Sequence, residues 1–63
     1  MDNFVAAYET ALTLGGRATK FTNQYFVISF PSQASLDDFY ELVSDLDGIR
    51  LAVMGTSVTV SRS

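Results

Sequence analysis

The sequence contains no cysteine and no histidine. Without cysteine, the chain can form neither a disulfide nor a thiolate metal site, so its stability has to come from packing. Without histidine, it lacks the commonest metal ligand and the usual general base near neutral pH. An enzyme built on this chain would have to work with carboxylates, a single lysine, tyrosines or serines. These absences predict a non-enzymatic protein without a metal or another cofactor.

Long apolar runs and an excess of basic charge are also missing. No apolar run approaches the roughly 18 residues that a membrane-spanning helix needs. The start does not resemble a secretory signal, because Asp2 stands where a basic region belongs and Glu9 interrupts the apolar stretch. A net charge of −3 and a pI of about 4.3 argue against indiscriminate binding to nucleic acid or anionic membranes. We therefore expect a cytoplasmic protein.

The composition that is present suits a small packed domain. The chain has 63 residues, of which 48% are hydrophobic and 13% aromatic, so we expect one domain over residues 1–63, near the lower size limit for a self-sufficient core. Burial between two copies would add stability to so short a chain, and both a monomer and a homodimer are compatible with it. The initiating methionine and the lack of tails favour a complete small gene product, of the kind that compact viral or bacterial genomes encode.

The second half of the sequence repeats the first at an offset of 32 residues. Without a gap, residues 4–29 align with residues 36–61 and five aligned pairs are identical, where ordinary residue usage gives roughly one or two. The apolar positions also correspond. The repeat predicts two helix–hairpin units, at about residues 3–30 and 35–62. The identical pairs are Tyr8/Tyr40, Glu9/Glu41, Leu14/Leu46, Gly16/Gly48 and Ser29/Ser61.

Each unit begins with a predicted helix. The first is capped by Asp2 or Asn3 and is ended by Gly15–Gly16, where glycine supplies a left-handed conformation. The second is predicted to begin at the cap Ser35 and to end at Gly48. Apolar residues recur every three or four positions and form one buried stripe on each helix: Phe4, Ala7, Tyr8, Ala11 and Leu12 on the first, and Leu36, Phe39, Val43 and Leu46 on the second.

Each unit then continues as a predicted hairpin. A type II′ turn at Gly55–Thr56 would pair Val53 with Val58, Leu51 with Val60 and Ile49 with Arg62, which makes one face apolar. A turn at Asn23–Gln24 would pair Phe21 with Phe26, pair Thr19 with Ile28 and bring Arg17 near Phe30. That turn is the weaker signal because it lacks glycine. In both hairpins a slip of one residue would expose the apolar side chains to water.

These elements predict an α+β fold of order αββαββ. We expect a pseudo-duplicated two-layer sandwich, in which a four-stranded antiparallel sheet carries both helices on one face. The other face of the sheet would stay open.

The carboxylates gather on the second helix. Asp37, Asp38, Glu41 and Asp45 could hold a hard cation such as Mg²⁺ loosely, or could imitate the phosphates of a nucleic acid. The favoured interpretation is the solvated outer face of an amphipathic helix. No glycine-rich phosphate loop is present, because Gly15–Gly16 ends a helix and lacks the lysine of a P-loop.

The open sheet face carries the predicted binding residues: Lys20, Tyr25, Val27, Arg50 and Met54. An ordinary solvated sheet face is the plain alternative, since its serine and threonine content is expected there. The functional prediction is a small acidic protein-interaction module, such as an inhibitor, adaptor or regulatory subunit, that acts by occupying a partner's surface. The alternatives are a single-stranded nucleic-acid binder that uses the same face and a self-associating structural subunit.

Overall fold

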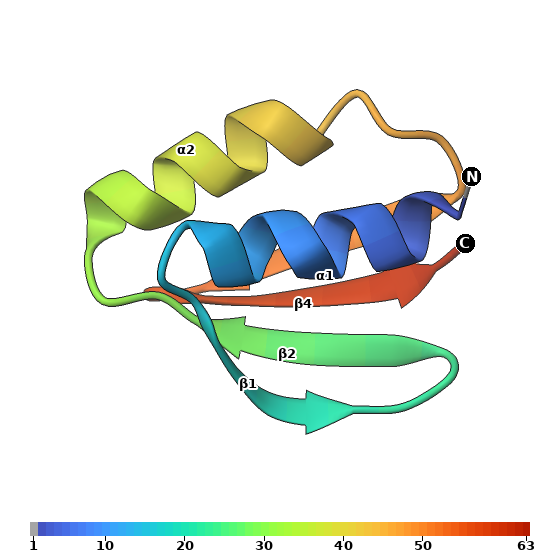
Figure 1. Ribbon diagram of the computed structural model, residues 1–63, viewed down its shortest axis with the longest axis horizontal. Helices are drawn as coiled ribbons and strands as arrows, with labels where there is room; N and C mark the ends of the chain where they lie inside the picture. The colour runs from blue at the N-terminus through green and yellow to red at the C-terminus, as the bar shows by residue number, and fades with distance from the viewer. Residues whose placement is uncertain (1) are drawn as a thin grey trace.

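The computed structural model describes residues 2–63, and Met1 lies outside the described residues. The chain runs through α1 (Asn3–Thr13), β1 (Arg17–Phe21), β2 (Tyr25–Ser29), α2 (Gln33–Val43), β3 (Ile49–Met54) and β4 (Ser57–Arg62). The strands form one antiparallel sheet in the order β1-β2-β4-β3. Both helices lie on the same side of the sheet (Figure 1). The predicted α+β fold of order αββαββ is confirmed.

The boundaries of α1 follow from its end residues. The Asp2 side chain caps the helix by accepting a hydrogen bond of 3.0 Å from the Phe4 N–H. At the other end Gly15 adopts a φ of +85°, and its N–H donates to the Leu12 carbonyl. Glycine adopts this left-handed conformation without steric cost, so the chain leaves the helix there. Both predicted ends of the first helix are confirmed.

The predicted ends of the second helix are wrong. The N-cap of α2 is Ser32, whose Oγ accepts a hydrogen bond of 3.2 Å from the Ser35 N–H. Because the helix starts three residues earlier, the Leu36 N–H donates to the Ser32 carbonyl, and the backbone hydrogen bonds of one more helical turn are formed. The helix ends at Val43, and Gly48, with a φ of +84°, lies in the loop before β3.

The second hairpin has the predicted register. Gly55 has a φ of +61° and Thr56 does not have a positive φ, as a type II′ turn requires. The strands pair from Met54 with Ser57 to Ile49 with Arg62 without a register shift.

The first hairpin departs from the predicted register after its second pair, Lys20 with Val27. Phe21 pairs with Phe26 as predicted, but a β-bulge at Thr19 places Ala18 opposite Ile28 and Arg17 opposite Ser29. The predicted pairing of Thr19 with Ile28 and the approach of Arg17 to Phe30 are therefore wrong. The bulge turns the small Ala18 toward the core, whereas Thr19 stays in solvent and its hydroxyl contacts the Val27 carbonyl at 3.4 Å. A threonine facing inward would bury its hydroxyl, which is unfavourable.

The core lies between the helices and the inner face of the sheet. It is a single cluster of eleven buried side chains, and none of the buried side chains among residues 2–63 is polar. Ten of the eleven form pairs at the 32-residue offset, so the repeat describes the core well. These pairs are Phe4/Leu36, Ala7/Phe39, Ala11/Val43, Phe26/Val58 and Ile28/Val60. Because Phe26 and Val58 point inward, the opposite face of the sheet is left open.

Candidate partner-binding surface

The outer sheet face is the side of the sheet that no helix covers. The register arranges its side chains in rows across the strands: Tyr25 lies opposite Ser61, which lies opposite Arg50, and Val27 stands between Lys20 and Thr59. The outer sheet face consists of the residues that share this side: Arg17, Lys20, Tyr25, Val27, Ser29, Arg50, Ala52, Met54, Ser57, Thr59 and Ser61.

All five predicted binding residues lie on the outer sheet face, but they do not form one cluster. Lys20, Tyr25 and Val27 are close neighbours on β1 and β2. Arg50 lies two strands away from Tyr25 in the same row, about 10 Å at the usual strand spacing. Met54 occupies the opposite corner and is 83% exposed. The serines and threonine of β4 separate the two groups.

Lys20 and Tyr25 interact directly. The Lys20 Nζ lies 5.5 Å from the centroid of the Tyr25 ring, within the range of a cation–π contact. Hydrogen bonding to the Tyr25 side chain, and then charge attraction to it, raise the pKa of Lys20 above its usual value. Lys20 therefore carries its charge throughout the physiological pH range, beside an aromatic ring that is half-buried in the sheet surface.

The bulge adds Arg17 to the outer sheet face, whereas the predicted register brought this residue near Phe30. Arg17 lies opposite Ser29, one row from Lys20, and is exposed. A signal for it was present in the sequence, because the unbulged register put the polar Thr19 on the core side. Such a conflict between pattern and register is typical of a bulge. The outer sheet face therefore has three cations, Arg17, Lys20 and Arg50, and no carboxylate.

Charge is segregated between the two layers of the molecule. All four basic residues belong to strands, whereas all seven acidic residues belong to helices or the segments next to them. Because three of the cations face outward from the sheet, the outer sheet face is positive and the helical layer is negative. The net charge of −3 conceals this separation.

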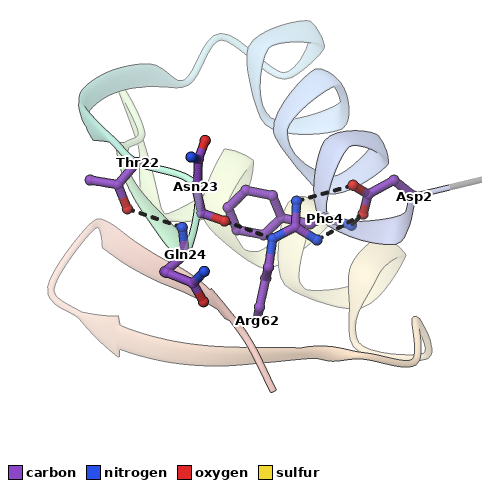
Figure 2. A network of polar contacts seen from close by, with 6 residues as sticks. All are labelled: Asp2, Phe4, Thr22, Asn23, Gln24 and Arg62. Atoms are coloured by element: carbon purple, nitrogen blue, oxygen red, sulfur yellow. Dashed lines mark hydrogen bonds and ion pairs between the residues drawn. The ribbon is translucent and has the colours of Figure 1, made fainter.

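Arg62, the fourth basic residue, is held in a network that joins both ends of the described chain (Figure 2). Its guanidinium forms a two-point ion pair with the Asp2 carboxylate, at 3.0 and 3.3 Å, and its Nε donates to the Asn23 carbonyl at 2.7 Å. The same group stacks 4.2 Å from the centroid of the Phe4 ring. The hydrogen bond from Arg62 lowers the pKa of Asp2 below its usual value. These contacts occupy Arg62 and give it a structural role.

The predicted acidic residues are exposed and spread along α2 and the turn after it. Asp37, Asp38 and Glu41 lie on the helix, and Asp45 follows it. Gln33 Nε2 donates to the Asp37 carboxylate at 3.1 Å. Within residues 2–63, no three acidic side chains lie close enough to hold a metal ion. A groove of about 340 Å³, lined by Leu14, Asp38, Glu41 and Leu42, runs beside this surface.

Comparison of the chain with protein-family models, with curated proteins and with solved structures gives no match. Neither α1 nor α2, each of 11 residues, has the length and apolar character needed to cross a lipid bilayer.

Proposed function

We propose that the chain is a non-enzymatic protein-interaction module whose outer sheet face binds a carboxylate-bearing surface of a partner protein. One observation carries the proposal: this face combines three cations, no carboxylate and exposed apolar side chains on a four-stranded sheet. Such a module would act as an inhibitor, adaptor or regulatory subunit by occupying its partner's surface. We place it in the cytoplasm, a reducing compartment that its lack of cysteine fits.

Tyr25 and Val27 supply the apolar part of the proposed contact. Aromatic residues and arginines dominate the binding energy of many interfaces, and they act best where surrounding groups exclude water. Tyr25 is already restrained by its neighbour Lys20, so little conformational entropy is lost when a partner covers it. The cations at the rim would then set the orientation and the association rate of a partner of opposite charge.

Binding of single-stranded nucleic acid is a second candidate, because three cations and a tyrosine on an open sheet also suit a phosphate backbone and a stacked base. The arrangement favours it less than a protein partner. Tyr25 is the only aromatic residue on the outer sheet face, and the Lys20 ammonium already lies over its ring. A base would have to displace that ammonium in order to stack.

An affinity capture tests the protein-binding proposal. The tagged protein is incubated with an extract of the organism that encodes it, and the captured proteins are identified by mass spectrometry. The affinity of each candidate is then measured with the purified partner. Tyr25→Ala should weaken the complex by about 2 kcal/mol, or roughly thirtyfold. The matched control is Leu42→Ala, which removes a side chain that is 61% exposed on the helical layer and should leave the affinity unchanged. An affinity that Tyr25→Ala does not alter would refute the proposal.

A single-stranded oligonucleotide distinguishes the second candidate. Its binding to the protein is followed by fluorescence anisotropy over a range of salt concentrations. A nucleic-acid binder should lose affinity steeply as the salt concentration rises. The double variant Lys20→Ala/Arg50→Ala should reduce the slope of log affinity against log salt concentration by the amount that about two phosphate contacts contribute. Binding that is absent, or that salt does not affect, removes this candidate and leaves the protein partner.

A further inference from the structure

The two edges of the sheet are protected unequally. The β1 edge is interrupted by the bulge at Thr19 and carries the cations Arg17 and Lys20, which are two common defences of an edge strand. The β3 edge has less protection: its six residues form an unbroken ladder with β4, without bulge or proline, and Arg50 is its one charge. Such an edge is a template for another strand.

The free hydrogen-bonding groups of β3 can be assigned from the register. In a two-residue hairpin the pair next to the turn, Met54 with Ser57, exchanges hydrogen bonds, and bonded and non-bonded pairs then alternate. Ile49, Leu51 and Val53 therefore direct their N–H and C=O groups away from β4. No strand lies beyond β3 within residues 2–63.

The helix flank above this edge carries one charge, Asp37, at its outer margin. At 100° per residue, Tyr40, Gln33 and Ser44 lie on one flank of α2 with Asp37 at its outer margin, whereas Asp38 and Asp45 lie on the opposite flank. Leu42 is on the same side as Asp38 and shares the groove with Leu14 of the α1 C-cap, so that flank faces α1. The flank with Tyr40 and Ser44 therefore faces the β3 edge.

Apolar side chains at this edge are also incompletely covered. In the first unit, Tyr8 packs against Phe21 with ring centroids 4.8 Å apart. The repeat places Tyr40 and Val53 at the equivalent positions. Val53 is smaller than phenylalanine, and the exposed fractions are 44% for Tyr40 and 48% for Val53.

From these observations we propose that β3 pairs antiparallel with β3 of a second copy of the chain. The two copies would form a twofold dimer with one continuous sheet of eight strands. The charge pattern favours a second copy over another partner, because the uncharged part of β3, residues 51–54, is complementary to itself, while both large faces of the molecule carry net charge. The dimer does not depend on the proposed function, although it would place two outer sheet faces side by side.

Arg50 selects the register of this pairing. With Leu51 on the twofold axis, the two Arg50 side chains would be diagonal neighbours about 7–8 Å apart, which brings like charges together. With Ala52 on the axis, Arg50 lies opposite Met54 of the second copy and Leu51 lies opposite Val53 of the second copy. The apolar pair then lies on the helix side of the sheet. We therefore assign the axis to Ala52.

Single-cysteine variants test this register without interference, because the natural chain has no cysteine. Ala52 would form a non-bonded antiparallel pair with its symmetry mate, with Cα atoms about 4.5 Å apart, a separation that a disulfide accepts. The matched control is Lys20→Cys, since Lys20 is the repeat equivalent of Ala52 on the other edge strand. Under mild oxidation, Ala52→Cys should give a covalent dimer at least tenfold faster than Lys20→Cys. Equal rates would overturn the proposal.

Sedimentation velocity provides the second measurement. An edge contact is at the small end of specific interfaces, under about 1,200 Å², so the dimer should dissociate in the micromolar range. The mean mass of the natural chain should therefore rise toward that of a dimer between low and high micromolar concentrations. Val53→Lys should keep the protein monomeric, whereas Phe21→Lys, the equivalent change at the β1 edge, should not. Circular dichroism checks that both variants are folded. A natural chain that stays monomeric, or a folded Val53→Lys variant that still dimerises, would overturn the proposal.

Discussion

At the scale of single residues, Arg62 makes the most varied set of contacts in the described chain. It is the last residue of β4, yet it bonds to the N-cap Asp2 and to the Asn23 carbonyl in the first hairpin turn, and it covers the Phe4 ring. Its backbone N–H also donates to the Gln24 carbonyl. One side chain thus connects the start of α1, the β1–β2 turn and the last strand. No repeat equivalent or local pattern in the sequence indicated this role.

Replacing Arg62 should therefore destabilise the fold measurably. Arg62→Ala removes the stacking on Phe4 together with several charge-assisted hydrogen bonds, and we expect the thermal midpoint to fall by about 4–8 °C, the change that roughly 1 kcal/mol produces in a domain of this size. Differential scanning calorimetry measures the midpoint. Arg50→Ala, which removes an exposed arginine from the outer sheet face, serves as the control and should change it little.

The ion pair also predicts a dependence of stability on pH. Because Arg62 lowers the pKa of Asp2 in the folded state, the stabilisation from this pair is present above the unfolded pKa, about 3.9, and is lost as the pH falls through the folded pKa. Asp2→Asn keeps a capping side chain but loses the charge. The difference in free energy of unfolding between the natural chain and Asp2→Asn should be constant from pH 7 to about pH 5 and should shrink below about pH 4.

Denaturant unfolding at each pH measures this difference. In the background of Arg62→Ala the same Asp2→Asn change should depend less on pH, because the largest cause of the lowered pKa of Asp2 is gone and only the backbone N–H groups of Phe4 and Val5 still lower it. An equal pH dependence in both backgrounds would show that Arg62 is not the cause.

At the scale of the elements, the sequence predicts the order and type of every helix and strand, because apolar periodicity and the repeat agree. The predicted buried stripe of α1 was wrong at Leu12, which is 44% exposed. The prediction also fails where two local choices are nearly equal in energy. Ser32 and Ser35 are both good N-caps, and the structure uses the earlier one because an additional helical turn is then satisfied. The bulge at Thr19 depends on the cost of burying one hydroxyl, which an alternating pattern does not record. Five residues of the candidate surface were placed on the outer sheet face from the sequence, and Arg17 was missed because of the bulge.

The paired glycines of the two units illustrate the limit of the repeat. A Cβ on Gly16 would lie 2.5 Å from Ile28 Cγ2 and 2.8 Å from the Ala11 carbonyl oxygen, whereas a Cβ on Gly48 would meet nothing within 4 Å. Gly48 instead needs glycine for its φ of +84°. Identical residues at equivalent positions therefore satisfy different requirements, one of space and one of backbone conformation.

Asparagine substitutions should separate these requirements. Asparagine tolerates the left-handed conformation better than other residues with a Cβ, so Gly48→Asn should cost less than about 1 kcal/mol in free energy of unfolding. Gly16→Asn forces a side chain into the packed α1–β2 contact and should cost about 1–3 kcal/mol or more. Chemical denaturation measures both. Equal effects of the two changes would contradict the assignment of different roles.

At the scale of the whole molecule, the separation of charge should direct an anionic ligand to one side of the protein. A short glutamate peptide provides a minimal carboxylate surface, and nuclear magnetic resonance of the ¹⁵N-labelled protein reports which amides respond to it. Shifts should be confined to the strands around Lys20, Val27 and Arg50, because attraction by the three cations of the outer sheet face acts there, while the carboxylates of α2 repel the peptide.

At about 1 M salt, where the screening length is about 3 Å, the shifts should largely disappear. The double variant Lys20→Ala/Arg50→Ala, which leaves Arg17 as the one cation of this face, should strongly reduce them at low salt, whereas Asp38→Asn/Glu41→Asn, which neutralises two carboxylates on the opposite layer, should preserve or strengthen them. Shifts spread equally over both layers would show that the peptide does not respond to the separation of charge, and the electrostatic part of the proposed interface would then be wrong.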